Sequence, residues 1–496
     1  MKTSRFEVLS QEEIERIHAA SMEILAEVGI KVHYKKARQL FREAGAEVDE
    51  QSLAVRLPER LVSWAVGQAP KQFALYGIDG GFRLDIGPNQ AEPVFAGLGT
   101  PTRMLDLRNG KVRPTTAQDM LDHIILIDAC NHIHNSQMDI WPNDIPMTTI
   151  HAEAIWAWAH NSHKPYGMGC YGYLPTWDMM RMMAIAVGGK DELQKRPRFF
   201  AICSVVSPLQ MDQMQAEGLL ICAEYGQPVT LSPEAIAGMT APVTLAGLVA
   251  QENAAILAHI TLAQIFRPGT PVLYGTVSTI ANMRSGTVAL GAVETGLITA
   301  GAAQMARHYG IPCRGVGATT ESKLEDVQAG MERTATLLQA VLAGVNFITC
   351  GGTLDSSMLE SHALLMLDDE LAGAALRIAR GIEVSAETLA IELIQEVARG
   401  AGGNYMSERH TVRHMRSEHF QTSLLPRDPY DAWETAGSRT ALELARERAS
   451  EILARHQPYE LDPSMEQELD AYRQMVAGRP LEEFYAGEVA ENQVWE

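Results

Sequence analysis

Short apolar runs alternate with longer helical stretches over most of the chain. From about residue 119 onward, seven runs rich in β-branched and aromatic residues are separated by segments with helical periodicity, at spacings of about 30 to 45 residues. The runs cover residues 133–141, 165–171, 198–206, 228–232, 271–277, 312–319 and 346–351. Strands that alternate with helices predict a parallel sheet of the α/β class, and seven such units favour a (β/α)8 TIM barrel over an open sheet.

The eighth strand of this barrel is harder to place, and residues 404–406, after a predicted helix at 386–399, are the best match. Before the barrel, Ser10-Gln11-Glu12-Glu13 forms a capping box that begins a helix, and Gly29 ends it. Further helical and β-like pieces follow this helix. The predicted domains are an N-terminal α+β cap (1–118), a catalytic (β/α)8 barrel (119–429) and a helical C-terminal extension (430–496) at the surface or in an oligomer contact.

Charge and composition narrow the classes of partner. The formal net charge of −20 gives an acidic surface that repels phosphate backbones and anionic lipids, so nucleic acid and membranes are not expected partners. The N-terminus runs into a polar helix without the apolar core of a signal peptide, which predicts a cytoplasmic protein. The six cysteines form no Cys-x-x-Cys pair and are typical of buried free thiols in a reducing compartment.

The most informative segment is Pro312-Cys313-Arg314-Gly315-Val316-Gly317-Ala318-Thr319, which resembles the end of a buried strand. An unpaired buried guanidinium is unfavourable by several kcal/mol, so Arg314 needs an anionic partner. Two partners stay open: the carboxylate of a ligand, bound in a bidentate pair, or a structural barrel acid such as Glu252.

In a (β/α)8 barrel the site lies at the carboxyl ends of the strands. The residues expected there are Trp141, Tyr171, Tyr173, Ser207, Ser232, Tyr274, Arg314, Thr319 and Cys350. This set lacks the carboxylate pair or the histidine–nucleophile pair of acid–base and covalent catalysis. It suits a small zwitterion instead, because aromatic faces hold a trialkylammonium group and Arg314 can bind a carboxylate. Core packing is the alternative for Trp141, Tyr171 and Tyr274.

Two acids are further candidates for binding a cationic group. Glu252 lies in the helix after the fourth predicted strand, and Asp355 follows the seventh. The alternatives are a structural acid for Glu252 and a turn or helix cap for Asp355. His410 and His414 would share one helix face, but the arginines between them would repel a cation, so we predict no metal site. A lip that receives a partner, or a solvated loop, remains open for this segment.

Several segments along almost the whole chain resemble, in order and spacing, the trimethylamine:corrinoid methyltransferase family. They are residues 17–30, Gly110-Lys111-Val112-Arg113, Ser207-Pro208-Leu209, Leu262-Ala263-Gln264, Gln328-Ala329-Gly330, residues 342–346 and Leu367-Asp368-Asp369-Glu370. The founding archaeal members carry pyrrolysine shortly before the Gln-Ala-Gly sequence, and that position is Thr319 here. The resemblance implies the pyrrolysine-free branch, which demethylates quaternary amines such as glycine betaine, proline betaine or carnitine.

The resemblance also implies that the methyl group passes to the Co(I) of a separate corrinoid protein. Nothing in the chain resembles a cobalamin-binding Asp-x-His-x-x-Gly loop, so we expect no cofactor bound in the chain, with the corrinoid carried by a partner. Thr319 is then a spectator or a pocket wall. Two alternatives remain: an enzyme of this family for another methylated amine, with a structural Arg314, and a non-catalytic betaine-binding barrel. A homo-oligomer is expected.

Overall fold

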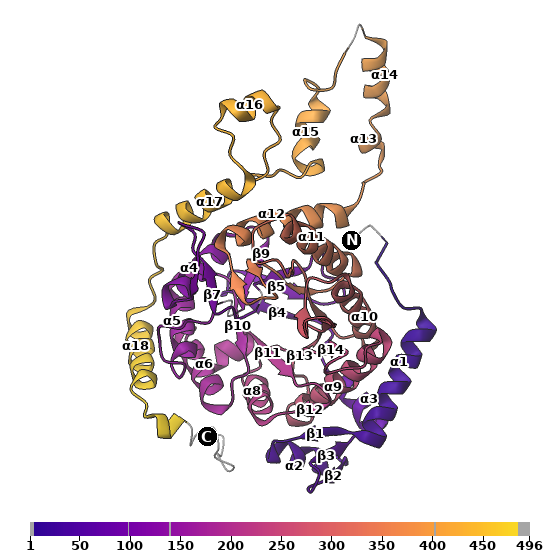
Figure 1. The fold of residues 1–496 in the computed structure, drawn as a ribbon, viewed down its shortest axis with the longest axis vertical. Coiled ribbons are helices and arrows are strands. Elements are labelled where there is room, and N and C mark those ends of the chain that lie inside the picture. The colour runs from indigo at the N-terminus through magenta and orange to yellow at the C-terminus, as the bar shows by residue number, and fades with distance from the viewer. Residues whose placement is uncertain (1–3, 98, 138–139, 401–402, 485–496) are drawn as a thin grey trace.

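The computed structural model describes residues 4–97, 99–137, 140–400 and 403–484. Its centre is a closed barrel of eight parallel strands, which confirms the predicted fold class (Figure 1). In order around the barrel the strands are β6 (Val94–Ala96), β9 (Ile133–Gln137), β10 (Tyr166–Gly169), β11 (Phe199–Val205), β13 (Val229–Pro233), β15 (Val272–Gly275), β18 (Cys313–Val316) and β19 (Phe347–Thr349).

The prediction of the eighth strand was wrong. The barrel closes through β6, which pairs in parallel with β19 and β9, whereas residues 404–406 form no strand. β6 has only three residues after Pro93, so its sequence carries too little periodicity to stand out. The barrel therefore takes its first strand from the segment assigned to the N-terminal cap, and the domain boundaries at 118 and 429 stay a prediction.

Each barrel strand is followed by a helix on the outside. These helices are α4 (Ala117–Ala129), α5 (Ile150–Asn161), α6 (Tyr173–Ala186), α8 (Gln213–Glu224), α9 (Leu245–Phe266), α10 (Val293–Tyr309), α11 (Val327–Ala343) and α12 (His362–Arg380), with the short α7 (Lys190–Lys195) after α6. α9 is long and apolar enough to cross a membrane, but 78% of its apolar window is buried inside the fold. α1 and α3 pack on α9 from the outside, so its apolar side chains are covered on both sides, as expected for a helix that is apolar all round.

The N-terminal segment covers one flank and one end of the barrel. The capping box between Ser10 and Glu13 begins α1 (Gln11–Glu23), as predicted. A π-helical turn (Ile24–Val28), β1 (Ile30–Val32), α2 (Lys35–Glu43), β2 (Glu47–Asp49), β3 (Ala54–Arg56) and α3 (Glu59–Gln68) complete this flank, with β12 (Gln210–Met211) pairing with β1. The hairpin of β4 (Phe73–Tyr76) and β5 (Arg83–Ile86) closes the amino-terminal end of the barrel, because Leu75 and Ile86 pack against the interior residues Phe200 and Phe347.

The loops at the opposite, carboxyl-terminal end form two small sheets. One contains β7 (Arg103–Leu105), β8 (Val112–Pro114), β20 (Thr353–Leu354) and β21 (Leu359–Glu360). The other contains β14 (Ile236–Ala237), β16 (Thr279–Asn282) and β17 (Thr287–Ala289). These sheets wall the mouth of the barrel and leave it open between them.

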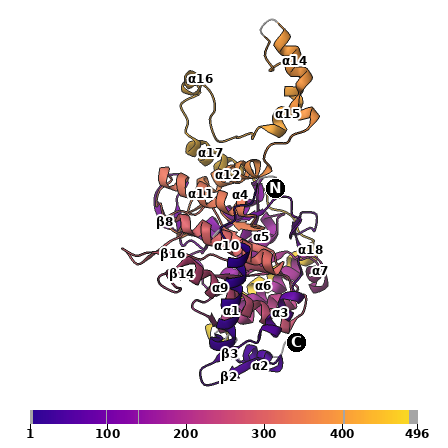
Figure 2. The same ribbon diagram turned by 90° about the vertical axis from the view of Figure 1, so that its right-hand side faces the viewer.

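After α12 the chain leaves the barrel and returns. α13 (Ala386–Leu389), α14 (Ile391–Arg399), α15 (Arg409–Glu418) and α16 (Tyr430–Thr435) project as an arm in which no described helical residue is buried (Figures 1 and 2). α17 (Ala441–Arg455) then packs on α12 and α4, and α18 (Pro463–Ala477) packs on α5 and α6. Two helices of the predicted C-terminal extension, α17 and α18, therefore pack on the outside of the barrel.

Candidate active site

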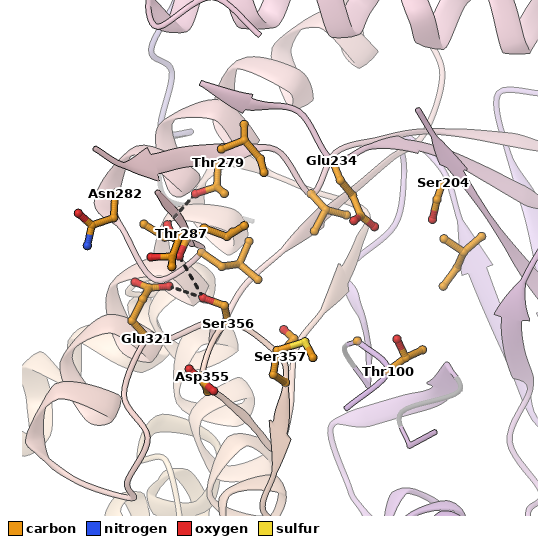
Figure 3. Close-up of a pocket in the computed structure, with 18 of the residues that line it drawn as sticks. Thr100, Ser204, Glu234, Thr279, Asn282, Thr287, Glu321, Asp355, Ser356 and Ser357 are labelled. Atoms are coloured by element: carbon orange, nitrogen blue, oxygen red, sulfur yellow. Dashed lines mark hydrogen bonds between the residues drawn. The ribbon is translucent and has the colours of Figure 1, made fainter. Parts of the chain in front are cut away.

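A cavity of about 1090 Å³ opens at the carboxyl ends of the barrel strands (Figure 3). The size is that of a small-molecule site, and the position is the one that (β/α)8 enzymes use. Its polar lining residues include Gln137, Ser204, Glu234, Thr279, Asn282, Arg314, Glu321 and Asp355, and Tyr171 adds an aromatic face.

The barrel strands decide which side chains reach this cavity. Successive side chains of a strand point to opposite faces. On β13, Leu231 packs in the outer hydrophobic layer and Ser232 lies inside the barrel next to Arg314. On β18, Cys313 belongs to the outer layer and Arg314 lines the cavity. The same alternation brings Glu234, two residues after Ser232, to the cavity wall.

Arg314 is a buried cation whose hydrogen-bonding capacity is only partly used. Its Nη1 lies 3.4 Å from both the Ser232 hydroxyl and the Thr276 carbonyl oxygen, and its Nε is buried without a partner. No carboxylate in the described part of the chain forms an ion pair with it. Burial lowers the pKa of Arg314 to about 10, and Glu234 opposes this shift, so the guanidinium stays charged at neutral pH.

Like Glu321, Glu234 is an acid of the cavity that the sequence analysis missed. Its side chain is exposed to the cavity space and accepts no hydrogen bond from the described residues. Figure 3 shows it projecting into the open centre between Ser204 and Thr279. The surrounding wall raises the pKa of Glu234 by desolvation, and the Arg314 charge lowers it again in part. An acid directly after a barrel strand, in step with the inward positions, was the signal that could have identified it.

Glu321 and Asp355 differ from Glu234 because protein groups already bind them. Glu321 accepts hydrogen bonds from the Gly291 N–H at 2.7 Å and from the Ser356 hydroxyl at 3.1 Å (Figure 3). The predicted candidate Asp355 does line the cavity, but its carboxylate lies 3.2 Å from Lys323 Nζ in an ion pair. Glu234 is therefore the acid with the most freedom to face a cation.

Tyr171 is the predicted aromatic residue that reaches the cavity. Its ring lies against Gly169, where an added Cβ would come within 2.6 Å of Tyr171 Cζ. Burial raises the pKa of Tyr171, so the phenol stays neutral. Trp141 lies outside the cavity lining and packs edge-on against Tyr171, with ring centroids 5.8 Å apart. It supports the position of the Tyr171 ring.

The structure places three other candidates away from the cavity lining. Tyr274 and Cys350 are fully buried in the outer hydrophobic layer, because they occupy outward positions of their segments. The Tyr274 hydroxyl donates to Asn253 Oδ1 at 3.0 Å and its ring stacks on Tyr309. Glu252 lies on α9 behind the barrel wall, accepts a hydrogen bond from the Thr276 hydroxyl at 3.0 Å, and has its pKa raised to about 8 by burial.

The position that corresponds to pyrrolysine, Thr319, lies just behind the cavity wall. Its side chain is 1% exposed, and its hydroxyl donates to the carbonyl oxygen of Leu290 at 2.8 Å. The Thr319 N–H donates to the Thr336 hydroxyl at 3.1 Å. Leu290 lines the cavity and Thr319 does not, so this threonine supports the wall.

The predicted histidine pair lies on the arm. His410 and His414 share one face of α15, with ring centroids 4.5 Å apart, and Glu387 lies 3.2 Å from His414 Nε2. Among the described residues no group of three or more His, Cys, Asp or Glu side chains is placed to hold a metal ion.

Comparison with known proteins identifies the family. The profile of the trimethylamine methyltransferase (MTTB) family matches residues 1–478. The chain is 33% identical over 471 residues to the glycine betaine methyltransferase of Desulfitobacterium hafniense, with 94% of this chain and 96% of the relative covered. It is 32% identical over 452 residues to the trimethylamine methyltransferase MttB of the same species, with 90% of each covered.

A third relative and one solved structure are also similar to this chain. The trimethylamine methyltransferase MttB of Methanosarcina thermophila is 31% identical over 473 residues, with 94% of this chain and 96% of the relative covered. The crystal structure of the Methanosarcina barkeri monomethylamine methyltransferase aligns over 96% of this chain and 95% of its own, with 11% identity and a TM-score of 0.45. On the match over nearly its whole length, this chain belongs to the trimethylamine methyltransferase (MTTB) family.

Proposed function

We propose that this enzyme transfers a methyl group from a carboxylated quaternary amine, such as glycine betaine, to the Co(I) of a separate corrinoid protein. The observation that carries the proposal is the pair of opposite charges in the cavity, Arg314 and Glu234, neither of which has a direct ionic partner among the described residues. A betaine carries the complementary pair of charges. The similarity to a glycine betaine methyltransferase supports the same substrate class.

The two ends of a betaine fit two parts of the cavity. Its carboxylate would bind the guanidinium of Arg314 in a bidentate pair, filling donors that now make only long contacts of 3.4 Å. Its ammonium group would face the Glu234 carboxylate and the Tyr171 ring, since both attract a quaternary cation. The bound zwitterion would thereby lie between Arg314 and Glu234 and give each of them an oppositely charged partner.

The chemistry then needs orientation more than acid–base groups. The nitrogen–methyl bond breaks and leaves its electron pair on nitrogen, while the methyl carbon accepts the electron pair of Co(I). The products are a neutral tertiary amine and a methyl group on Co(III), and no proton moves. Because the quaternary nitrogen already carries its charge, a threonine at position 319 is compatible with the reaction. Arg314, Glu234 and Tyr171 would hold the methyl group in line for attack.

The experiment combines the enzyme, glycine betaine and a corrinoid protein reduced to Co(I), and follows the absorbance change to methyl-Co(III). We expect conversion only when all three are present, with dimethylglycine as the second product. Trimethylamine should fail, and choline, which lacks the carboxylate, should react far more slowly. Equal rates with trimethylamine, or demethylation without any corrinoid, would show that the proposed reaction is wrong.

A further inference from the structure

Exposed apolar side chains lie on the segments that follow four neighbouring barrel strands, β13, β15, β18 and β19, at the mouth of the cavity. We define the apolar rim as Met239, Val243, Met283, Val327, Met331 and Met358, whose exposed fractions range from 47% to 78%. They lie in the loop after β14, in the β16–β17 hairpin, at the start of α11 and in the β20–β21 turn. Each of these segments follows the carboxyl end of a barrel strand. Figure 2 shows the β16 hairpin projecting from the barrel on the side where β14 and β8 also lie.

The rim is continuous with the cavity and has packed contacts of its own. A Cβ on Gly238 would lie 3.1 Å from Met283 Sδ and 3.6 Å from Val243 Cγ2, so the loop and the hairpin lie together. In the β20–β21 turn, Met358 is itself part of the cavity lining, and so is Val288 of the hairpin. A large molecule that reaches into the cavity would therefore contact Met358 and the β16–β17 hairpin.

The part of the rim that follows β14 is poor in charge. Residues 235–251, which supply Met239 and Val243, contain no charged side chain, although 21% of the chain is charged. Exposed apolar side chains grouped around a cavity and rimmed by polar residues mark an interaction site in a soluble protein. The surface thus has the character of an interface for another macromolecule.

We propose that the apolar rim is the docking surface for the corrinoid protein that accepts the methyl group; this inference rests on the proposed function. The acceptor cobalt comes from outside the chain, and the mouth within the rim is its route to the substrate. An apolar contact around that route excludes water from the nucleophilic Co(I). Flexible methionines suit a partner that must dock and leave in every turnover, because they repack at low energetic cost.

The test compares two methyl acceptors, a corrinoid protein and free cob(I)alamin, in enzymes with single changes in the rim. The two changes are Met283→Glu in the β16–β17 hairpin and Met331→Glu at the start of α11, at residues that are 71% and 70% exposed. Each should raise the half-saturating concentration of the corrinoid protein by at least about tenfold, since a charge placed in an apolar contact weakens docking. The rate with free cob(I)alamin, the KM for glycine betaine and the thermal midpoint should stay near the wild-type values.

Met475→Glu on α18 is the matched control, because Met475 is 46% exposed on the flank of the barrel and away from the mouth. It should change none of these quantities. An unchanged half-saturating concentration of the corrinoid protein in both rim variants would overturn the docking proposal. It would do so even if the variants changed the oligomeric mass of the enzyme. A wild-type enzyme that methylates neither acceptor would instead overturn the proposed function, and the docking surface with it.

Discussion

We expect Arg314 to determine much of the substrate selectivity of the cavity. Arg314→Ala should weaken binding of glycine betaine by about 2–4 kcal/mol, the range for removing one partner of a buried charged pair. Arg314→Lys should recover only part of this loss, because a point charge cannot form the two parallel hydrogen bonds of a guanidinium. Isothermal titration of the folded variants measures both effects.

Choline is the control ligand, since it has the quaternary nitrogen without the carboxylate. Its affinity should fall little, or even rise, when Arg314 is removed. Betaine affinity that is unchanged in a folded Arg314→Ala protein would mean that the carboxylate binds elsewhere.

Glu252 links stability to pH. Its pKa is raised to about 8 in the folded protein, against 4.5 for an accessible glutamate, so the folded state holds the proton more tightly. The contribution to stability is complete below pH 4.5 and is lost as the pH rises through 8. Between pH 4.5 and 8 the free energy of unfolding should therefore fall less in Glu252→Gln than in the wild type. The difference should be a few kcal/mol, at about 1.4 kcal/mol per pKa unit. Urea unfolding at pH 5, 7 and 9 measures it, and parallel pH profiles for the two proteins would contradict it.

At individual residues, the sequence predicted more about strand ends than about strand faces. Arg314, Tyr171 and Asp355 follow from their positions at the ends of predicted strands, and all three line the cavity. Tyr274 and Cys350 also lie near strand ends but point outward, and exact strand register was needed to exclude them. The same register would have identified Glu234.

Among the elements, β10 contains one glycine that the barrel packing requires and another that the site requires. Gly167 and Gly169 face the barrel interior, but an added Cβ would meet different obstacles: the backbone oxygen of Phe200 at 2.6 Å and the ring of Tyr171 at 2.6 Å. Gly167→Ala should lower the thermal midpoint, since backbone cannot move aside. Gly169→Ala should keep most of the stability and weaken betaine binding by about tenfold, roughly 1.4 kcal/mol, by displacing the ring. Scanning calorimetry and titration of both variants separate the two effects, and equal losses of stability would contradict the assignment.

The strands that the sequence failed to predict share one physical property, which is that tertiary contacts define them. β6 is three residues long, and both of its partner strands, β9 and β19, lie more than 30 residues away along the chain. The small sheets at the mouth are built from strands of two to four residues, whose pairing depends on loops that the barrel brings together. Periodicity identifies long elements reliably, and these are too short to show any.

For the molecule as a whole, the arm of α13–α16 is the part whose stability the barrel does not explain. Its helices are at most 10 residues long and bury no described residue, and helices of that length are marginal in water on their own. Several of its apolar side chains are exposed, among them Ile391 at 57% and Ile394 at 48%. We expect these exposed apolar side chains to be covered in solution, and a second copy of the chain is the partner that is always present.

We therefore expect the protein to self-associate through the arm. Light scattering after gel filtration should give a multiple of 54.3 kDa for the wild type. Ile391→Glu combined with Ile394→Glu should lower the mass toward one chain, because the two side chains lie on one face of α14 and would place charges in the contact. The barrel should keep its thermal midpoint and its reaction with free cob(I)alamin, since α14 contributes nothing to the core. A wild-type mass of 54.3 kDa, or a variant mass equal to that of a wild-type oligomer, would show that the arm does not join two copies.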